Sequence, residues 1–171
     1  MSGQAPVAVL VGPPGAGKTT VGALLAARLG TVFRDSDDLI EQAQGRSISD
    51  IFVEDGEPAF RAMERETVLA ALGDGGGVLA LGGGAVLDEQ VQAALASHVV
   101  VFLDVAIADA SKRVGFDGSR PLLAVNPRAS WTRLMQARRP VYEAISTIRV
   151  DTAGRTPEQV LDALLSELER G

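Results

Sequence analysis

Residues 7–20 read VAVLVGPPGAGKTT, and this stretch decides the fold. Its first five residues are all apolar, as in a short strand that is buried on both faces of a parallel sheet. The next eight, Gly12 to Thr19, match the spacing G-x-x-x-x-G-K-[ST] of a phosphate-binding loop. A helix is expected to follow, because apolar residues recur at helical spacing as far as Leu29 and Gly30 stands at the C′ position. Strand, glycine-rich loop and helix in this order are the context that such a loop requires.

The residue types of this loop suit a nucleoside triphosphate. Glycines let backbone N–H groups close around phosphate oxygens, and the helix that follows adds the positive end of its dipole. Lys18 supplies a point charge, and the Thr19 hydroxyl is a ligand for Mg²⁺. The competing interpretation is a glycine-rich turn with a surface lysine, and the strand-loop-helix context disfavours it.

Strands and helices alternate along the rest of the chain. Further strands are expected at four apolar runs: 32–33, 78–81, 99–104 and 148–151. Helices are expected within 37–72, with breaks at Gly45 and Gly56, and at 88–95, 107–113 and 128–142. A last helix is expected to begin at Pro157, because Thr156 and Gln159 form a possible capping box there. We predict one α/β domain over residues 1–171, with a five-stranded parallel sheet, helices on both faces and ligands at the carboxyl ends of the strands.

Composition limits the class of protein. Lys and Arg number 16 against 22 Asp and Glu, so the formal net charge is −6, which disfavours binding of nucleic acid or an anionic membrane over the whole surface. The chain has no cysteine, which excludes disulfides and thiolate metal sites and fits a reducing compartment. Residues 1–6 lack a basic region, and the apolar run before Gly12 is too short for a signal peptide or a membrane span. We expect a cytoplasmic protein.

Two other classes with this loop fit less well. A GTPase switch protein should carry an N-K-x-D-like motif, but Lys112, the only lysine besides Lys18, is followed by Arg113, Val114 and Gly115. An ATPase is expected to end an apolar strand on a Mg²⁺-binding aspartate, as Asp104 does, but no glutamate follows to polarise water. We interpret Asp104 as a strand-terminal residue without a metal.

A better metal candidate is the segment Asp35-Ser36-Asp37. In an extended segment these carboxylates, two residues apart, would point the same way, one toward Mg²⁺ and one toward a substrate. The alternative is helix capping, which we favour for Asp38. For Asp35 and Asp37 the motif alone leaves both interpretations open.

Six motifs in order and spacing from residue 12 to residue 142 resemble the shikimate kinase family. They are the loop at 12–20, Asp35-Ser36-Asp37, Asp55-Gly56-Glu57 with Phe60-Arg61, Gly82-Gly83-Gly84-Ala85, Arg120-Pro121-Leu122-Leu123 and Arg138-Arg139-Pro140-Val141-Tyr142. The resemblance implies a three-layer P-loop kinase fold like that of nucleoside monophosphate kinases. It also implies transfer of the ATP γ-phosphate to the 3-hydroxyl of shikimate.

The same resemblance assigns the nucleotide side. ATP would be held by Gly15, Ala16, Gly17, Lys18, Thr19 and Thr20. Thr19 would bind Mg²⁺ directly and Asp35 through water. Arg113 and Pro157 would sandwich adenine, with Arg155 near the nucleotide. Arg120 resembles the arginine of a mobile lid, here near 115–124, that closes over the transferring phosphate; the competing interpretation is an exposed loop arginine.

On the acceptor side the resemblance assigns shikimate binding to Asp37, Arg61, Gly82, Gly83, Gly84 and Arg138. Arginines suit the one carboxylate of shikimate, and a carboxylate acceptor suits its hydroxyls. Three assignments have alternatives. Arg61 could lie on a solvated helix face between Glu57 and Glu64, the glycines could be a loose strand exit, and Arg139 could replace Arg138.

We therefore predict a monomeric kinase in which Lys18, Asp37 and Arg120 act on the transferring phosphate and the attacking hydroxyl. One alternative is a gluconate or nucleoside monophosphate kinase, although adenylate kinase-like loops usually place Gly after the lysine, where this chain has Thr19. Another is a non-catalytic module that senses ATP. His98 is interpreted as a surface residue, and Trp131 and Tyr142 as packing residues.

Overall fold

The computed structural model describes residues 5–13, 15–105 and 127–170, with side chains from residue 129 in the last range. The predicted helix at 107–113, the predicted lid at 115–124, Arg113 and Arg120 lie outside the described residues.

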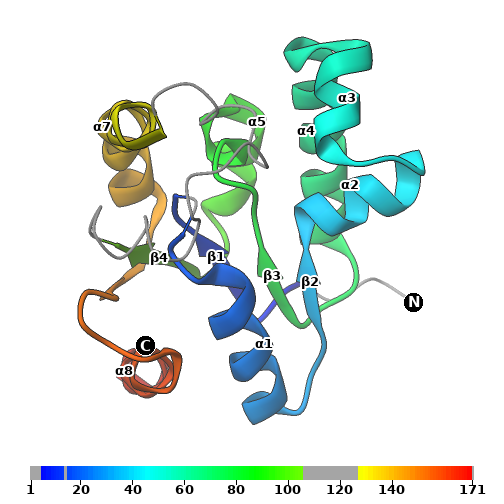
Figure 1. Cartoon of the computed structure of the whole chain (residues 1–171). Helices are drawn as coiled ribbons and strands as arrows, with labels where there is room; N and C mark the ends of the chain where they lie inside the picture. The colour runs from blue at the N-terminus through cyan, green and yellow to red at the C-terminus, as the bar shows by residue number, and fades with distance from the viewer. Residues whose placement is uncertain (1–4, 14, 106–126, 171) are drawn as a thin grey trace.

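Five strands of the described chain form one parallel sheet. They are β1 (Ala8–Val11), β2 (Phe33–Asp35), β3 (Val78–Ala80), β4 (Val100–Asp104) and β5 (Ile148–Asp151). Their order across the sheet is β2-β3-β1-β4-β5, and every neighbouring pair is parallel. The five predicted strands are confirmed to within one or two residues at their ends (Figure 1).

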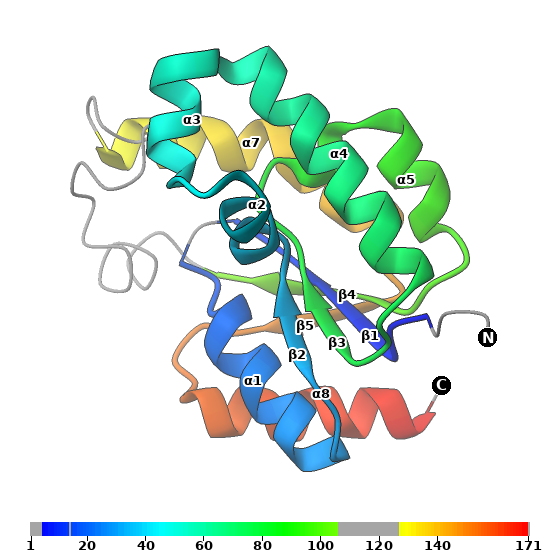
Figure 2. The same ribbon diagram turned by 90° about the vertical axis from the view of Figure 1, so that its right-hand side faces the viewer.

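Helices cover both faces of this sheet. They are α1 (Lys18–Leu29), α2 (Ser36–Gln44), α3 (Ile48–Asp55), α4 (Glu57–Gly73), α5 (Glu89–Leu95), α7 (Pro127–Ile145) and α8 (Pro157–Arg170), with a 3-10 turn η1 at Ala85–Leu87. Figure 2 shows α1 and α8 below the sheet and α4, α5 and α7 above it, with α2 and α3 on the same upper side. The predicted three-layer α/β architecture is confirmed.

The core lies in the middle of the sheet. Every residue of β1 and β3 is fully buried, because these strands have a neighbouring strand on each side and helices on both faces. Phe102 on β4 is also fully buried and stacks on Tyr142 of α7, with ring centroids 5.1 Å apart. This contact joins the upper helical layer to the sheet.

The last helix begins where the sequence predicts. The Thr156 N–H donates to Gln159 Oε1 (2.8 Å), and the Gln159 N–H donates to Thr156 Oγ1 (3.2 Å). These reciprocal bonds satisfy two backbone donors that the helix itself cannot use. The capping box and the first helical position of Pro157 are confirmed.

The start of α2 differs from the prediction. Asp35, not Asp38, is the N-cap residue: its Oδ1 accepts the Asp37 N–H at 2.8 Å. The helix therefore begins at Ser36, and Asp37 is helical rather than extended. The expectation of two carboxylates on one side of an extended segment is wrong, because the first aspartate of the run already satisfies the cap and the helix starts immediately after it.

The glycines at 75–77, whose role the sequence does not reveal, surround Arg34. Its guanidinium donates to the carbonyl of Ala71 (3.0 Å) in the last turn of α4 and to those of Asp74 (2.9 Å) and Gly76 (2.8 Å) after it. A Cβ on Gly75 would lie 2.5 Å from Arg34 Nη1, so no larger residue fits there without movement. This loop is structural and lies at the amino end of β3.

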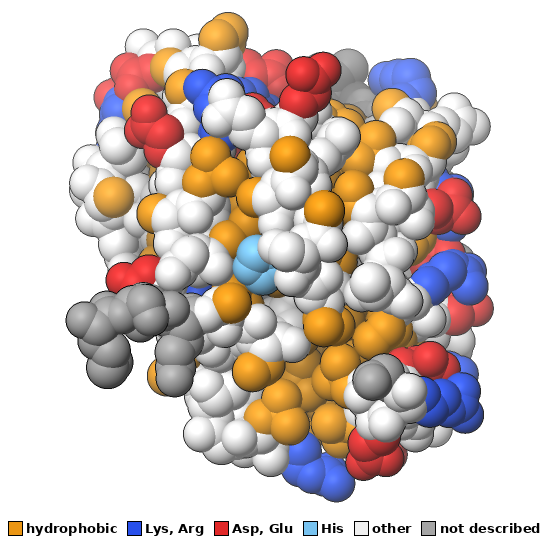
Figure 3. Space-filling view, turned by 180° about the vertical axis from the view of Figure 1, so that it is seen from behind, with side chains coloured by type: hydrophobic (Ala, Val, Ile, Leu, Met, Phe, Trp, Pro, Cys, Tyr) orange, Lys and Arg blue, Asp and Glu red, His pale blue; other side chains and the backbone are white. Residues whose placement is uncertain are grey.

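Charge is distributed in small groups on the face seen from behind. Figure 3 shows apolar and uncharged side chains in the middle of this face, with Lys and Arg only near its margins. Among the described residues, no helix combines the length and apolar character needed to cross a bilayer.

Candidate active site

The phosphate-binding loop joins the carboxyl end of β1 to α1. Gly15 and Gly17 have φ of 86° and 89°, which L side chains rarely adopt. Gly17 is the N-cap residue of α1 and has no side chain with which to cap it. The Lys18 ammonium donates to the carbonyls of Gly12 (2.8 Å) and Pro13 (3.1 Å). The loop therefore presents a helix N-terminus and a cation at the end of β1, where an anion is expected to bind.

The first turn of α2 lies beside this loop. Thr19 Oγ1 and Asp35 Oδ2 are 3.4 Å apart, while Asp35 Oδ1 holds the Asp37 N–H. One carboxylate oxygen thus caps a helix and the other faces the loop hydroxyl. A hydroxyl and a carboxylate are ligands that suit Mg²⁺, which usually takes few protein ligands and keeps waters and phosphate oxygens. The described residues contain no cluster of three or more His, Cys, Asp or Glu side chains arranged for a metal.

A second group of polar side chains surrounds the glycine run after β3. A Cβ on Gly82 would lie 2.7 Å from Asp37 Oδ1 and 3.0 Å from Glu64 Oε2. A Cβ on Gly84 would lie 2.6 Å from Arg61 Nη1. The contacts with Asp37 and Arg61 are shorter than real Cβ atoms make, and the contact with Glu64 is unusually tight, so a larger residue at either position would displace the ends of these side chains. This close approach favours a packed wall over a merely loose strand exit.

Arg61 is held by two glutamates of its own helix. Its Nη1 donates to Glu64 Oε1 at 2.7 Å, and its Nη2 lies 3.3 Å from Glu57 Oε2. Glu64 is 3% exposed, and its burial raises the pKa of this carboxyl above 4.5; the charge of Asp37 adds to the rise, while Arg61 and Arg138 oppose it. Arg61 therefore pairs with glutamates on its own helix face and is held in one orientation by the same contacts, so the two interpretations of this residue are compatible.

Arg138 and Arg139 leave α7 in different directions. Arg139 donates to both carboxylate oxygens of Asp104, each at 2.8 Å, and Arg149 also donates to Asp104. Arg138 is 3% exposed, and its charge acts on Glu64 and Tyr142. The Nε of Arg138 has no hydrogen-bond partner among the described residues. Arg138, not Arg139, therefore belongs to the group around the glycine run.

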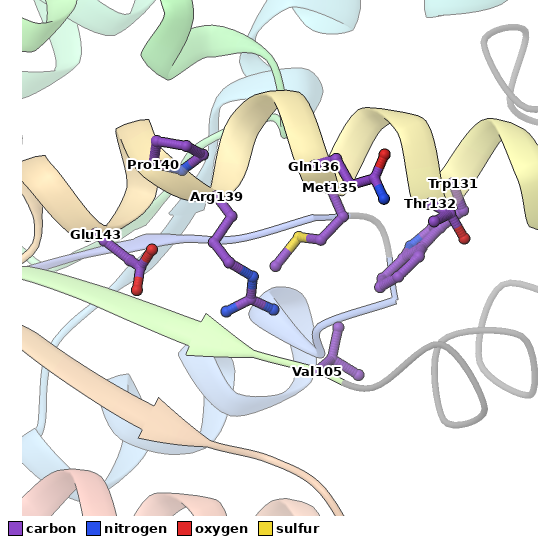
Figure 4. Close-up of a pocket in the computed structure, with 8 residues that line it drawn as sticks. All are labelled: Val105, Trp131, Thr132, Met135, Gln136, Arg139, Pro140 and Glu143. Carbon is purple, nitrogen blue, oxygen red and sulfur yellow. The ribbon is translucent and has the colours of Figure 1, made fainter.

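Arg139 lines a separate pocket of about 450 Å³ (Figure 4). Its other lining residues are Val105, Trp131, Thr132, Met135, Gln136, Pro140 and Glu143. Figure 4 shows Arg139 pointing from α7 toward β4, with Met135 beside it. Arg138, Arg61 and Asp37 do not line this pocket.

The structure brings the remaining predicted residues together only in part. Ala16 is buried in the loop and Thr20 is exposed on the first turn of α1. Arg155 lies between β5 and α8, and Pro157 is the first residue of α8; both are exposed at the carboxyl edge of the sheet. Trp131 is 4% exposed, which confirms it as a packing residue, and His98 is half-buried.

Two hydroxyl groups of the site escaped the sequence analysis. Ser36 is fully buried and its Oγ accepts the Gly82 N–H at 2.9 Å. Tyr142 does pack in the core, but its hydroxyl also donates to the Gly83 carbonyl at 2.7 Å. The available signals were the place of Ser36 between two aspartates and the i+4 spacing of Tyr142 from Arg138, which puts both on one face of α7.

Comparisons with known proteins agree with this geometry. A family model described as shikimate kinase matches residues 14–169. A shikimate kinase of Streptomyces coelicolor is 56% identical over 166 residues, which are 97% of this chain and 97% of that protein. A solved shikimate kinase from Acinetobacter baumannii in complex with shikimate has a TM-score of 0.91 and 34% identity, over 98% of this chain and 94% of that one. A gluconokinase from Sinorhizobium meliloti shares the fold alone, with a TM-score of 0.56 and 17% identity over 96% of this chain and 92% of that one.

Proposed function

The chain belongs to the shikimate kinase family, and on that premise we propose how its own residues bring ATP and shikimate together. The activity is ATP-dependent phosphorylation of the 3-hydroxyl of shikimate, a step toward chorismate and the aromatic amino acids. The observation that best supports our assignment of residues is the first turn of α2. Asp35 lies against Thr19 of the phosphate-binding loop, and two residues later Asp37 lies against Gly82. One short segment therefore contacts both halves of the site.

The acceptor half binds shikimate in this proposal. Arg61 and Arg138 bind its carboxylate, because guanidinium groups pair with carboxylates through two parallel hydrogen bonds. Asp37 accepts from the hydroxyls and orients the 3-hydroxyl for attack. The backbone of Gly82, Gly83 and Gly84 forms one wall. Supporting this, Arg61 is already oriented by Glu64, and the buried Nε of Arg138 has no partner among the described residues.

The nucleotide half binds ATP through the backbone of Gly15 to Thr20. Lys18 balances the phosphate charge, and Arg120, on a lid near 115–124, closes over the transferring group. Arg113 and Pro157 would enclose the adenine, with Arg155 nearby. Thr19 would hold Mg²⁺ directly and Asp35 through water, and the position of these two oxygens beside each other, 3.4 Å apart, supports such a pair. When bound, the ion neutralises charge on the phosphate oxygens.

The reaction then depends on placement more than on covalent chemistry. Asp37 holds the attacking hydroxyl in line with the γ-phosphate, while Lys18 and Arg120 stabilise the charge that develops during transfer. We further propose that residues 1–171 act as one domain and as a monomer in the cytoplasm, without nucleic acid or membrane partners. The net charge of −6 supports the last point.

A coupled assay of ADP release tests this function. Purified protein with ATP and Mg²⁺ is offered shikimate, gluconate and nucleoside monophosphates in separate reactions. We expect turnover with shikimate only. Turnover of another acceptor and none of shikimate would overturn the assignment. Binding of ATP without turnover of any acceptor would instead favour a nucleotide-sensing module.

A further inference from the structure

The backbone of the glycine run leaves the sheet between two buried hydroxyl groups. The Leu81 N–H still donates to Leu10 O of β1, at 3.0 Å. Beyond it, the Gly82 N–H donates to Ser36 Oγ (2.9 Å) and the Gly83 carbonyl accepts from the Tyr142 hydroxyl (2.7 Å). The two hydroxyls come from α2 and α7, which are far apart in the sequence.

We propose that Ser36 and Tyr142 are positioning residues of the acceptor site, whose hydroxyls fix the backbone of Gly82 and Gly83 and thereby set the affinity for shikimate. The proposal rests on the proposed function, because it treats the glycine run as a wall of the shikimate site. Neither residue needs to touch the substrate.

Tyr142 is well suited to hold a backbone group in place. Its ring is fully buried and stacks on Phe102 of β4 at an interplanar angle of 29°. Because this packing fixes the ring, it also fixes the position of the hydroxyl. Burial raises the pKa of Tyr142 to about 12, which keeps the hydroxyl protonated and able to donate. Tyr142 also follows Arg138 by one helical turn, so the same face of α7 contacts the glycine run and presents the arginine.

Ser36 fixes the run from the opposite element. It is the first residue of α2 and is fully buried between Asp35, which faces the phosphate-binding loop, and Asp37, which faces Gly82. Its Oγ therefore ties the position of the glycine backbone to the position of both aspartates.

Glycine backbone needs such partners because it has no side chain of its own to pack. Gly82 lies directly against Asp37 and Glu64, and Gly84 against Arg61. Loss of either hydroxyl removes the partner of a half-buried backbone group and lets the run shift against these side chains. Small displacements of binding groups weaken binding without changing the reacting atoms.

A purely structural role makes a different prediction. If the hydroxyls only satisfy half-buried backbone groups, their removal lowers the stability of the fold and leaves the kinetic constants of the folded enzyme unchanged. The split between KM and kcat therefore separates the two roles.

The test uses the full chain with Tyr142→Phe, which keeps the ring on Phe102, and Ser36→Ala. We expect each variant to raise the KM for shikimate about tenfold, with kcat and the KM for ATP within about twofold of the parent values. The control is Thr147→Val. The Thr147 hydroxyl contacts both the N–H (2.9 Å) and the carbonyl (3.0 Å) of Val100, at the opposite end of the sheet. We expect this control to melt at a lower temperature with an unchanged KM for shikimate.

An unchanged KM for shikimate in folded Tyr142→Phe and Ser36→Ala, whatever their melting temperatures, would overturn the proposal. If Tyr142→Phe does not fold, the KM of Ser36→Ala decides. If the parent chain does not turn over shikimate, the proposed function fails and this inference fails with it. If the parent chain does turn over shikimate and the two variants have its KM, only the inference fails.

Discussion

Arg139 donates two hydrogen bonds to Asp104, both at 2.8 Å, and this pair ties α7 to the end of β4. Burial alone would raise the pKa of Asp104, but the hydrogen bonds and charges of Arg139 and Arg149 outweigh it and hold the pKa below 3.8. Arg139 is thus engaged in the scaffold, while its neighbour Arg138 has the role proposed for it in the acceptor site. Two adjacent arginines have separate tasks because successive residues of a helix point about 100° apart.

Exchange of each arginine for lysine should separate these tasks. Arg138→Lys should raise the KM for shikimate at least tenfold, because lysine cannot form the two parallel bonds to a carboxylate. Arg139→Lys should lower the free energy of unfolding by about 1 kcal/mol and leave that KM unchanged. Steady-state kinetics and urea denaturation of both variants check this. A raised KM in Arg139→Lys with a normal KM in Arg138→Lys would reverse the assignment.

The sequence predicts the fold well because its signals are local. The apolar run of β1, the spacing of the loop and the capping box of α8 each depend on residues that lie close together in the chain. The start of α2 was mispredicted because three aspartates in four residues compete for one cap, and only the backbone geometry selects Asp35.

The contacts of the site are less predictable, because they join distant segments. The bond from Tyr142 to Gly83 spans 59 residues, and that from Gly82 to Ser36 spans 46. Nothing in the local pattern distinguishes Tyr142 from an ordinary core tyrosine. The choice of Arg138 over Arg139 came from the family motif alone, and the structure adds its physical reason, the pairing of Arg139 with Asp104.

The ionised Glu64 carboxylate should lower the stability of the fold and strengthen the binding of shikimate. Its pKa is raised by burial, so its contribution to folding is full below its unfolded pKa and is lost as pH rises through the folded pKa. Glu64→Gln does not ionise, so at pH 7 the variant should be more stable than the parent, and the difference should shrink toward pH 4. The shikimate KM should rise, because Arg61 loses a charged partner.

Urea denaturation at pH 7 and pH 4 measures the stability difference. Glu66→Gln is the control: Glu66 is exposed on the same helix, and its exchange should have little effect at either pH. A Glu64→Gln variant less stable than the parent at pH 7 would contradict the prediction.

Asp35→Asn should weaken the response to Mg²⁺ without unfolding α2. In the parent chain Asp35 Oδ1 accepts the Asp37 N–H at 2.8 Å, and asparagine keeps an oxygen that can accept the same bond. The exchange does remove the negative charge beside Thr19. The Mg²⁺ concentration for half-maximal rate should rise about tenfold at fixed ATP, with a melting temperature close to that of the parent. Kinetics at varied Mg²⁺ test this, and an unchanged Mg²⁺ dependence would remove Asp35 from the proposed metal site.

Lys18→Met should abolish phosphoryl transfer and keep the fold. The Lys18 ammonium donates to the carbonyls of Gly12 and Pro13 in its own loop, and Lys18 is not part of the apolar core around the sheet. The γ-phosphate has no substitute for the cation, so kcat should fall by a factor of about 100 or more. The far-ultraviolet circular dichroism should be unchanged. A variant with normal turnover would exclude Lys18 from the reaction.

Asp37 and Asp38 offer the sharpest comparison, because they are adjacent and have the same side chain. Asp37 Oδ1 lies against Gly82, whereas Asp38 is exposed on α2. Asp37→Asn keeps the size and the hydrogen-bonding oxygen but loses the charge that orients the attacking hydroxyl. Its kcat should therefore fall about 100-fold, with a smaller change in the KM for shikimate. Asp38→Asn should change neither constant by more than about twofold. If both variants lose activity equally, the charge of the α2 terminus as a whole is required, and the specific contact of Asp37 with the hydroxyl is refuted.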